Sequence, residues 1–233
     1  MSFPSPGRRT VMGMRRSTML LVVTIGFAVL YLAASLALGS SPPKASDSGP
    51  KVAAWFQAHD GNVRTWLWLL TIGGPLFATY AAIVRGVLPA PHRDVFLFGA
   101  ISFGVQTAVQ GWIWGGLALH PNTLTSADAR LGLDIALYWG PVLTAAVIAM
   151  LAPVAVAVLA GRTALPRWVG IVAAIAVAEQ LVETLTVFGH HGFFAPGGPM
   201  NLDVGAGISA IALIAVGITV ARSLAAQPQE SIA

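Results

Sequence analysis

The chain has 233 residues, of which 56% are hydrophobic and only 9% are charged. Soluble domains carry roughly a quarter charged residues, so this composition excludes an ordinary water-soluble fold. The 13 lysines and arginines outnumber the 9 acidic residues, but they stand singly or in pairs at the ends of apolar runs. This placement is typical of membrane insertion and predicts no nucleic-acid partner. Because cysteine is absent, disulfides and thiolate metal sites are excluded, and the sequence names no cofactor.

Six apolar runs are long enough to cross roughly 30 Å of hydrocarbon, which takes a helix of about 20 residues. We therefore predict an all-α integral membrane bundle formed by one domain, residues 19–224, between a basic N-terminus (1–18) and a short tail (225–233). The first run exceeds the roughly 7–15 residues of a signal-peptide core, so we expect it to be retained as a span. The predicted spans are residues 19–38, 66–88, 95–119, 131–159, 168–188 and 204–224.

The lysines and arginines are unequally divided between the two ends of these spans, nine against four. The positive-inside rule then predicts that both termini are cytoplasmic, N-in and C-in, and that the longer loops face outward. In the first outer loop, the spacing of Val52, Trp55, Phe56 and His59 predicts a short interfacial helix. The Gly- and Pro-rich loop of residues 189–199 is expected to fold over the bundle mouth.

Glycines and prolines inside the spans predict bends and close packing. We expect bends at residues 73–75 (Gly-Gly-Pro), at Pro141 and at Pro153, because a missing backbone donor weakens the helix there. Gly111 and Gly115 form a small-residue face that favours packing within the chain over dimerisation.

The fifth span carries two acidic residues one turn apart. Glu179, Glu183, Thr186 and His190 share one face of a continuous helix, at i, i+4, i+7 and i+11. An acid near the centre of a membrane helix costs about 2.5–3.5 kcal/mol to insert, so this face is expected to meet protein, water or a ligand.

Helix rise places other polar residues at similar depths. Gln106 and Glu179 both lie about 16 Å from the inner ends of their spans, and Gln110 and Glu183 both lie about 22 Å in. No lysine or arginine occurs at this depth. The acids could be neutralised by protonation, by a bound cation, by an outer arginine or by a histidinium. The i, i+4 spacing of Arg130 and Asp134 also fits a plain ion pair. The predicted residues of an outward-facing polar pocket are Glu179, Glu183, Gln106, Gln110, Asp134, Tyr138 and His190.

Several functions fit such a pocket. Binding or transport of a small polar or cationic ligand, or of a proton, is favoured because ionisable groups within membranes are usually functional. A six-helix transporter would be expected to form a homo-oligomer or to work as a subunit. The alternatives are an accessory or structural subunit of a membrane complex and a metal-dependent membrane enzyme. The polar residues could also serve only to form hydrogen bonds between helices. Glu179, Glu183 and His190 are the candidate metal ligands, although their spacing matches no established motif. No catalytic residue is predicted.

Two stretches also carry a resemblance. Val-Ala-Ala-Trp-Phe-Gln-Ala-His-Asp (52–60) precedes the second span, and Gly-Phe-Phe-Ala-Pro-Gly-Gly-Pro (192–199) precedes the sixth. With Glu179 and the arginine-bearing N-terminus, they resemble a group of small, uncharacterised actinobacterial membrane proteins over most of the chain. The resemblance implies a bacterial plasma membrane and carries over no catalytic residue.

Overall fold

The computed structural model describes residues 7–39 and 42–226, with side chains from residue 16 onward. Most of the predicted cytoplasmic N-terminus and tail therefore lies outside the described side chains. The described residues are helical and contain no strand. Six helical segments in this part are long and apolar enough to cross a membrane, as predicted. These segments are Arg16–Ala37, Gly49–Arg85, His92–Leu119, Ser126–Leu159, Arg167–Phe188 and Met200–Ala226.

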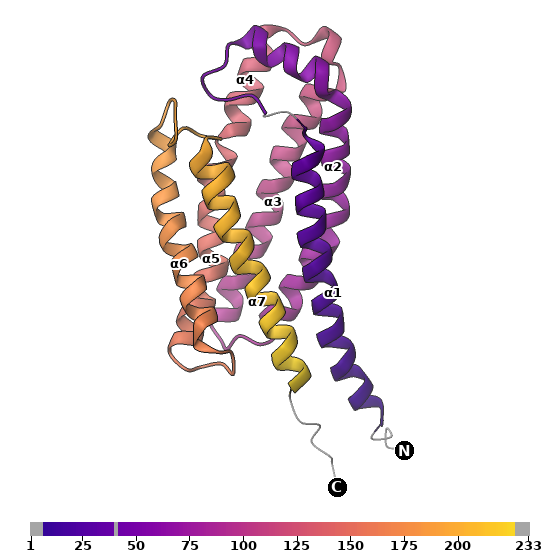
Figure 1. Cartoon of the computed structure of the whole chain (residues 1–233), viewed down its shortest axis with the longest axis vertical. Helices are drawn as coiled ribbons and strands as arrows, with labels where there is room; N and C mark the ends of the chain where they lie inside the picture. Colours follow the sequence, from indigo (N-terminus) through magenta and orange to yellow (C-terminus); the bar gives the residue numbers. More distant parts are fainter. Residues whose placement is uncertain (1–6, 40–41, 227–233) are drawn as a thin grey trace.

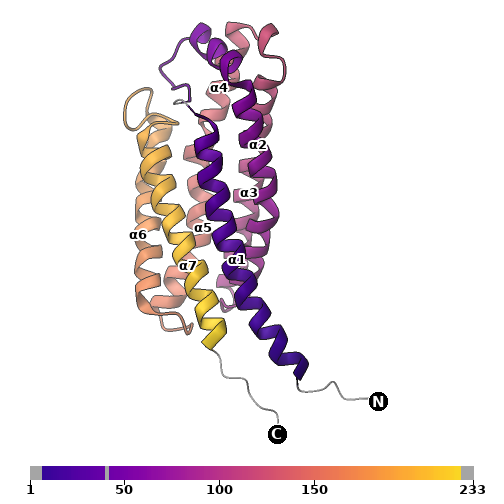
Figure 2. The same cartoon turned by 45° about the vertical axis from the view of Figure 1, so that its right-hand side comes forward.

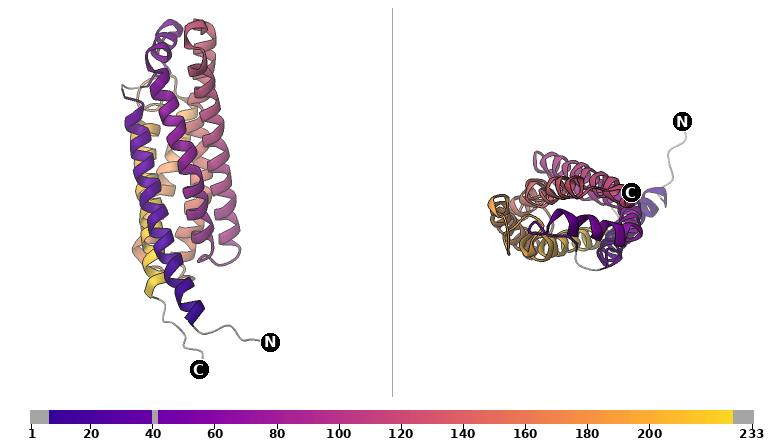
Figure 3. Two further views of the ribbon diagram at one scale, coloured as in Figure 1. Left: turned by 90° about the vertical axis from the view of Figure 1, so that its right-hand side faces the viewer. Right: turned by 90° about the horizontal axis from the view of Figure 1, so that it is seen from above.

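Six helices form a closed ring, in which each contacts the next and the last returns to the first. In ring order they are α1 (Gly7–Ala37), α2 (Gly49–Arg85), α3 (His92–Leu119), α5 (Trp139–Leu159), α6 (Arg167–Glu183) and α7 (Ala206–Ala226). Figure 1 shows that α1 begins and α7 ends at the same end of the bundle. Figure 2 shows α1 and α7 side by side, and the view from above in Figure 3 shows that the ring is oval.

Small residues bring neighbouring helices of the ring close together. A Cβ at Gly99 of α3 would lie 2.7 Å from the backbone nitrogen of Met150, so α3 and α5 meet backbone to backbone there. Cβ atoms at Gly111 and Gly115 would lie 3.1 and 2.9 Å from the side chain of Leu67 on α2. The small-residue face of α3 thus packs within the chain, as the sequence favoured.

The segment predicted as a separate interfacial helix is continuous with the second span. Helix α2 begins at Gly49, and its backbone leaves the helical region at His59 (φ −128°, ψ 19°) rather than at the predicted bend of residues 73–75. The ring centroids of Trp55 and Phe56 lie 5.8 and 5.5 Å from that of Trp114 on α3. These aromatics therefore pack against α3, and the kink at His59 turns the start of α2 over the end of the ring (Figure 3).

The fourth span consists of two helices. Helix α4 (Ser126–Leu137) follows a short 3₁₀ turn, η1 (Pro121–Thr123). The helix is interrupted at Tyr138, and α5 begins at the next residue. Pro141 then falls in the first turn of α5, where its missing N–H costs no helical bond. The interruption predicted near Pro141 therefore lies just before it, while Pro153 stays inside α5.

Candidate functional site

The end of α6 departs from the continuous helix that the sequence predicted. Helix α6 ends at Glu183, a 3₁₀ helix η2 (Thr184–Phe188) follows, and the loop of residues 189–199 leads to a π-helix, η3 (Met200–Gly205). Because a 3₁₀ helix has three residues per turn and Gly189 is extended, the glutamate face does not continue to His190, which is exposed. The prediction for His190 was wrong on this point, whereas Thr186 is fully buried beside Glu183.

The carboxylate of Glu183 is held by two amide groups. Glu183 is only 4% exposed. Asn201 of η3 donates from Nδ2 to Glu183 Oε1 at 2.6 Å, and Gln180 donates from Nε2 to Glu183 Oε2 at 2.5 Å. Asn201 Nδ2 also reaches Thr186 Oγ1 at 3.2 Å, and Asn201 Oδ1 accepts from the backbone of Gly197 at 3.0 Å. This network joins α6, η2, the loop and η3.

Glu179 shares a donor with Glu183. Gln180 Nε2 donates to Glu179 Oε2 at 2.9 Å, so one amide group bridges both carboxylates. The second oxygen, Glu179 Oε1, is buried and has no hydrogen-bond partner among the described residues. We call Glu179, Gln180, Glu183 and Asn201 the glutamate cluster.

Two glycines make room for the glutamate cluster. A Cβ at Gly205 would overlap Glu183 Oε2 and lie 2.7 Å from Glu183 Cδ. A Cβ at Gly140, in the first turn of α5, would lie 2.9 Å from Cγ of Asn201. The cluster is therefore enclosed by α5 and η3 as well as by its own helix.

The glutamate cluster contains no basic group. None of the ion pairs in the described part of the chain involves Glu179 or Glu183. Amide donors compensate a carboxylate only through partial charges, so a proton or a cation is needed to neutralise a buried one.

Two of the predicted pocket residues, Asp134 and Tyr138, lie on α4 and at its junction with α5, and no hydrogen bond in the described chain joins either of them to the glutamate cluster. Asp134 forms a bidentate ion pair with Arg130, whose Nε donates to Asp134 Oδ2 at 3.0 Å and whose Nη2 donates to Asp134 Oδ1. Arg130 also donates to the backbone carbonyl of Asp47, which ties the first outer loop to α4. Tyr138 is 44% exposed at the junction of α4 and α5.

Gln106 and Gln110 of α3 are separated from the glutamates by a helix. Helix α3 packs against one side of α5 and α6 packs against another, so α5 stands between them (Figure 1). Gln106 donates to Ser102 Oγ at 2.8 Å, and its Oε1 is buried without a partner in the described chain. The structure therefore brings together Glu179, Glu183 and Thr186, and no hydrogen bond in the described chain joins the α3 and α4 residues of the predicted pocket to them.

The candidate metal ligands Glu179, Glu183 and His190 do not meet. Among the described residues, no group of three or more histidines, aspartates or glutamates is placed to hold a metal ion. His190 is exposed, so only Glu179 and Glu183 of the three candidate ligands belong to the glutamate cluster.

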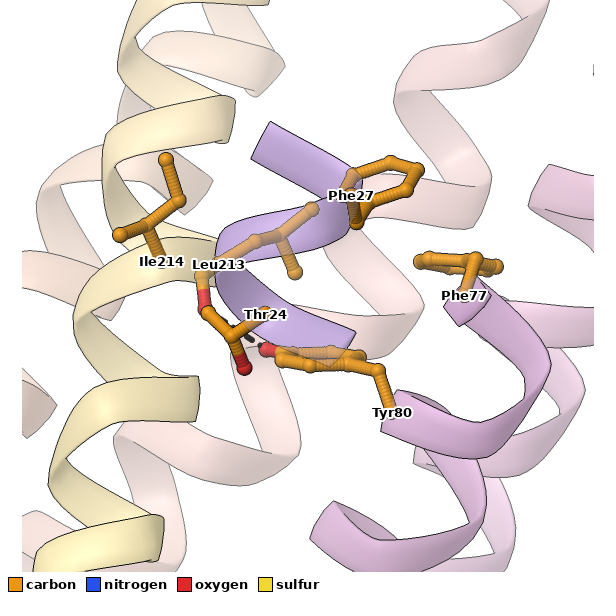
Figure 4. A pocket seen from close by; sticks show the side chains of 6 residues that line it. All are labelled: Thr24, Phe27, Phe77, Tyr80, Leu213 and Ile214. Carbon is orange, nitrogen blue, oxygen red and sulfur yellow. Dashed lines mark hydrogen bonds between the residues drawn. The ribbon is translucent and has the colours of Figure 1, made fainter. Parts of the chain in front are cut away.

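A small hollow of about 10 Å³ lies elsewhere in the ring, between α1, α2 and α7. Figure 4 shows Tyr80 reaching across it, where its hydroxyl donates to the carbonyl of Leu213 at 2.8 Å. Thr24 uses its hydroxyl within α1, bonding to the carbonyl of Leu20. The side chains lining the hollow are uncharged: Thr24, Phe27, Phe77, Tyr80, Leu213 and Ile214.

Sequence reasoning missed Gln180, Asn201 and Gly205. The sixth span was predicted to begin at residue 204, which left Asn201 in a loop, whereas the π-helix extends the segment back to Met200. A π-turn is rare and often marks a functional site, but its sequence signal is weak.

Comparisons with protein-family models, curated proteins and solved structures found no match to this chain. Function is therefore inferred from the geometry of the chain, and the actinobacterial resemblance stays a prediction.

Proposed function

We propose that this protein is a multi-pass protein of the bacterial plasma membrane that binds and transports a proton or a small polar or cationic ligand at the glutamate cluster. Glu183 is the proton-carrying group. The observation that carries the proposal is that Glu183 is 4% exposed and is bonded to two neutral amides, without a basic partner in the described chain.

The energetics of burial support exchange of a proton at this position. An isolated charge taken from water into a protein interior costs several kcal/mol even after relaxation, whereas a protonated carboxyl group avoids that cost. Asn201 and Gln180 can also reorient to offer an amide oxygen as an acceptor, because each amide has both a donor and an acceptor end. The same two residues can thus support either protonation state of Glu183.

The position of the cluster supports access from outside the cell. Helices α6 and α7 are joined at the end of the bundle opposite to the start of α1 (Figure 1). With both termini in the cytoplasm, as the positive-inside rule predicts, the cluster lies in the outer half of the membrane. Protons would then enter beneath the loop of residues 189–199.

Infrared spectroscopy of the protein in lipid bilayers tests the proposal. We expect the wild type to show the carbonyl band of a protonated carboxyl group, and Glu183→Gln to lose it. Asp203→Asn is the matched control, because Asp203 is an exposed acid on the same π-helix, and it should keep the band. A wild type without this band, or a band that persists unchanged in Glu183→Gln, would refute proton binding at Glu183.

Transport is tested in vesicles that contain a pH-sensitive dye. Under an imposed potential, the wild type should acidify the vesicle interior, and Glu183→Gln should reduce the rate at least tenfold. Equal rates for wild type and empty vesicles would refute transport. If the protein also co-purified with a fixed partner, the accessory-subunit alternative would replace it.

A further inference from the structure

Two buried polar atoms, one on α6 and one on α7, lack hydrogen-bond partners among the described residues. Glu179 Oε1 and Ser209 Oγ are both buried and unpartnered among the described residues. Ser209 is only 7% exposed, so water does not reach its hydroxyl from the surface. A buried hydroxyl without a partner requires an explanation, and a bound ion or water is one of those that physical chemistry offers.

Helix register places these two atoms at the same depth. Glu183 contacts the position of Gly205, where a Cβ would overlap its carboxylate. Glu179 precedes Glu183 by one turn of α6, and Ser209 follows Gly205 by one turn of α7. Because α6 and α7 are antiparallel neighbours, one turn back along α6 and one turn forward along α7 reach the same level.

The titratable groups around Glu179 and Ser209 indicate which kind of species could bind to both residues. Both oxygens of Glu183 already accept amide hydrogens, which leaves Glu179 Oε1 as the free carboxylate oxygen. Helix α5 carries no titratable side chain, Arg222 near the inner end is the titratable residue of α7, and Asp203 of η3 is exposed. Toward this end of the bundle, Asp134 is paired with Arg130, and Tyr138, His190 and His191 are exposed. A species that links Glu179 to Ser209 therefore meets one negative charge and one neutral hydroxyl.

We propose that Glu179 Oε1 and Ser209 Oγ are ligands of a monovalent metal cation bound between α6 and α7. Carboxylate and hydroxyl oxygens are hard ligands that suit such an ion, and the single carboxylate balances its charge. A divalent ion beside a single carboxylate would keep an unbalanced positive charge in the protein interior, which is costly. This inference rests on the proposed function, because it names the cation that shares the glutamate cluster with the proton of Glu183.

Sodium-dependent thermal unfolding in lipid nanodiscs tests the inference. At constant ionic strength, replacing choline with Na⁺ should raise the Tm of the wild type, and the shift should be lost in Glu179→Gln and in Ser209→Ala. Ser223→Ala, on the same helix nearer its inner end, should keep the shift. In choline, Ser209→Ala should unfold no earlier than the wild type, because its hydroxyl has no partner to lose; this separates ligation from a structural role.

The outcomes separate this inference from the proposed function. A wild type without a Na⁺-specific shift at neutral and alkaline pH, or a full shift in both variants, would overturn the cation site. The infrared band of Glu183 would be unaffected by that result. A wild type that lacks the infrared band but shows a normal Na⁺ shift would overturn the proton proposal and leave the Na⁺-binding geometry in place.

Discussion

Replacing Asn201 with alanine tests whether the glutamate cluster holds α6 and α7 together. Asn201 donates to Glu183 and Thr186 and accepts from the backbone of Gly197, so the change removes three hydrogen bonds. Hydrogen bonds between membrane helices average about 0.6 kcal/mol and reach about 1.7 kcal/mol. Leaving a buried donor or acceptor without a partner costs about 1–3 kcal/mol. We therefore expect Asn201→Ala to lower the free energy of unfolding by about 2–4 kcal/mol.

The assay is unfolding in mixed micelles followed by tryptophan fluorescence. Asn62→Ala is the matched control, because Asn62 makes a single bond to the carbonyl of Ala37 and should cost only about 0.5–1.5 kcal/mol. A double-mutant cycle with Glu183→Leu isolates the amide–carboxylate contact. If the two changes add within about 0.5 kcal/mol, Asn201 and Glu183 are independent, and the reasoning is refuted.

Three further predictions follow from single contacts. Gly205→Ala should destabilise the protein by about 1–3 kcal/mol in the same assay, because its Cβ would overlap Glu183, whereas Gly207→Ala, with nothing within 4 Å of a Cβ, should leave stability unchanged or raise it. Tyr80→Phe should cost about 0.5–1.5 kcal/mol and keep the packing; a change near zero would contradict a contribution from its bond to α7. Burial raises the pKa of Asp47, but hydrogen bonds from a backbone N–H and a lysine outweigh this and hold the pKa below its usual value. Its stabilising effect should therefore be present above about pH 4 and be lost as the pH falls through the lowered pKa, so Asp47→Asn should flatten the acid limb of the Tm profile, and an unchanged limb would contradict this.

The spans were predictable because they depend on the length and apolarity of continuous segments. Each predicted run overlaps one of the six helices that can cross a membrane. The breaks were less predictable. Pro141 indicated an interruption that the structure places at Tyr138, and residues 73–75 indicated a bend where the backbone stays helical. Proline and glycine show where a helix is weakened, whereas tertiary packing decides where it departs from helical geometry.

Within the candidate site, the sequence could predict only that the glutamates avoid lipid, because that depends on the cost of burying a charge and not on which helices are neighbours. Glu183 had to avoid lipid, and the structure buries it. The depth argument for Gln110 used distance along the membrane normal, which does not say which helices are neighbours; α5 separates Gln110 from Glu183. Asn201 could not be found from helical periodicity, because it sits in a π-helix that follows an irregular loop.

The site that results differs from the predicted open pocket in a way that bears on mechanism. A wide polar pocket would keep its carboxylates hydrated and charged, and proton binding would then depend little on the fold. In the glutamate cluster, Glu183 Oε1 shares its donor, Asn201 Nδ2, with Thr186 of η2. A proton on Glu183 would weaken its hold on Asn201, so proton exchange would be felt directly by the π-helix that begins the last span. Gly205 leaves no room for a side chain between that π-helix and the carboxylate, so a displacement of the Glu183 carboxylate toward the π-helix would press directly on its backbone.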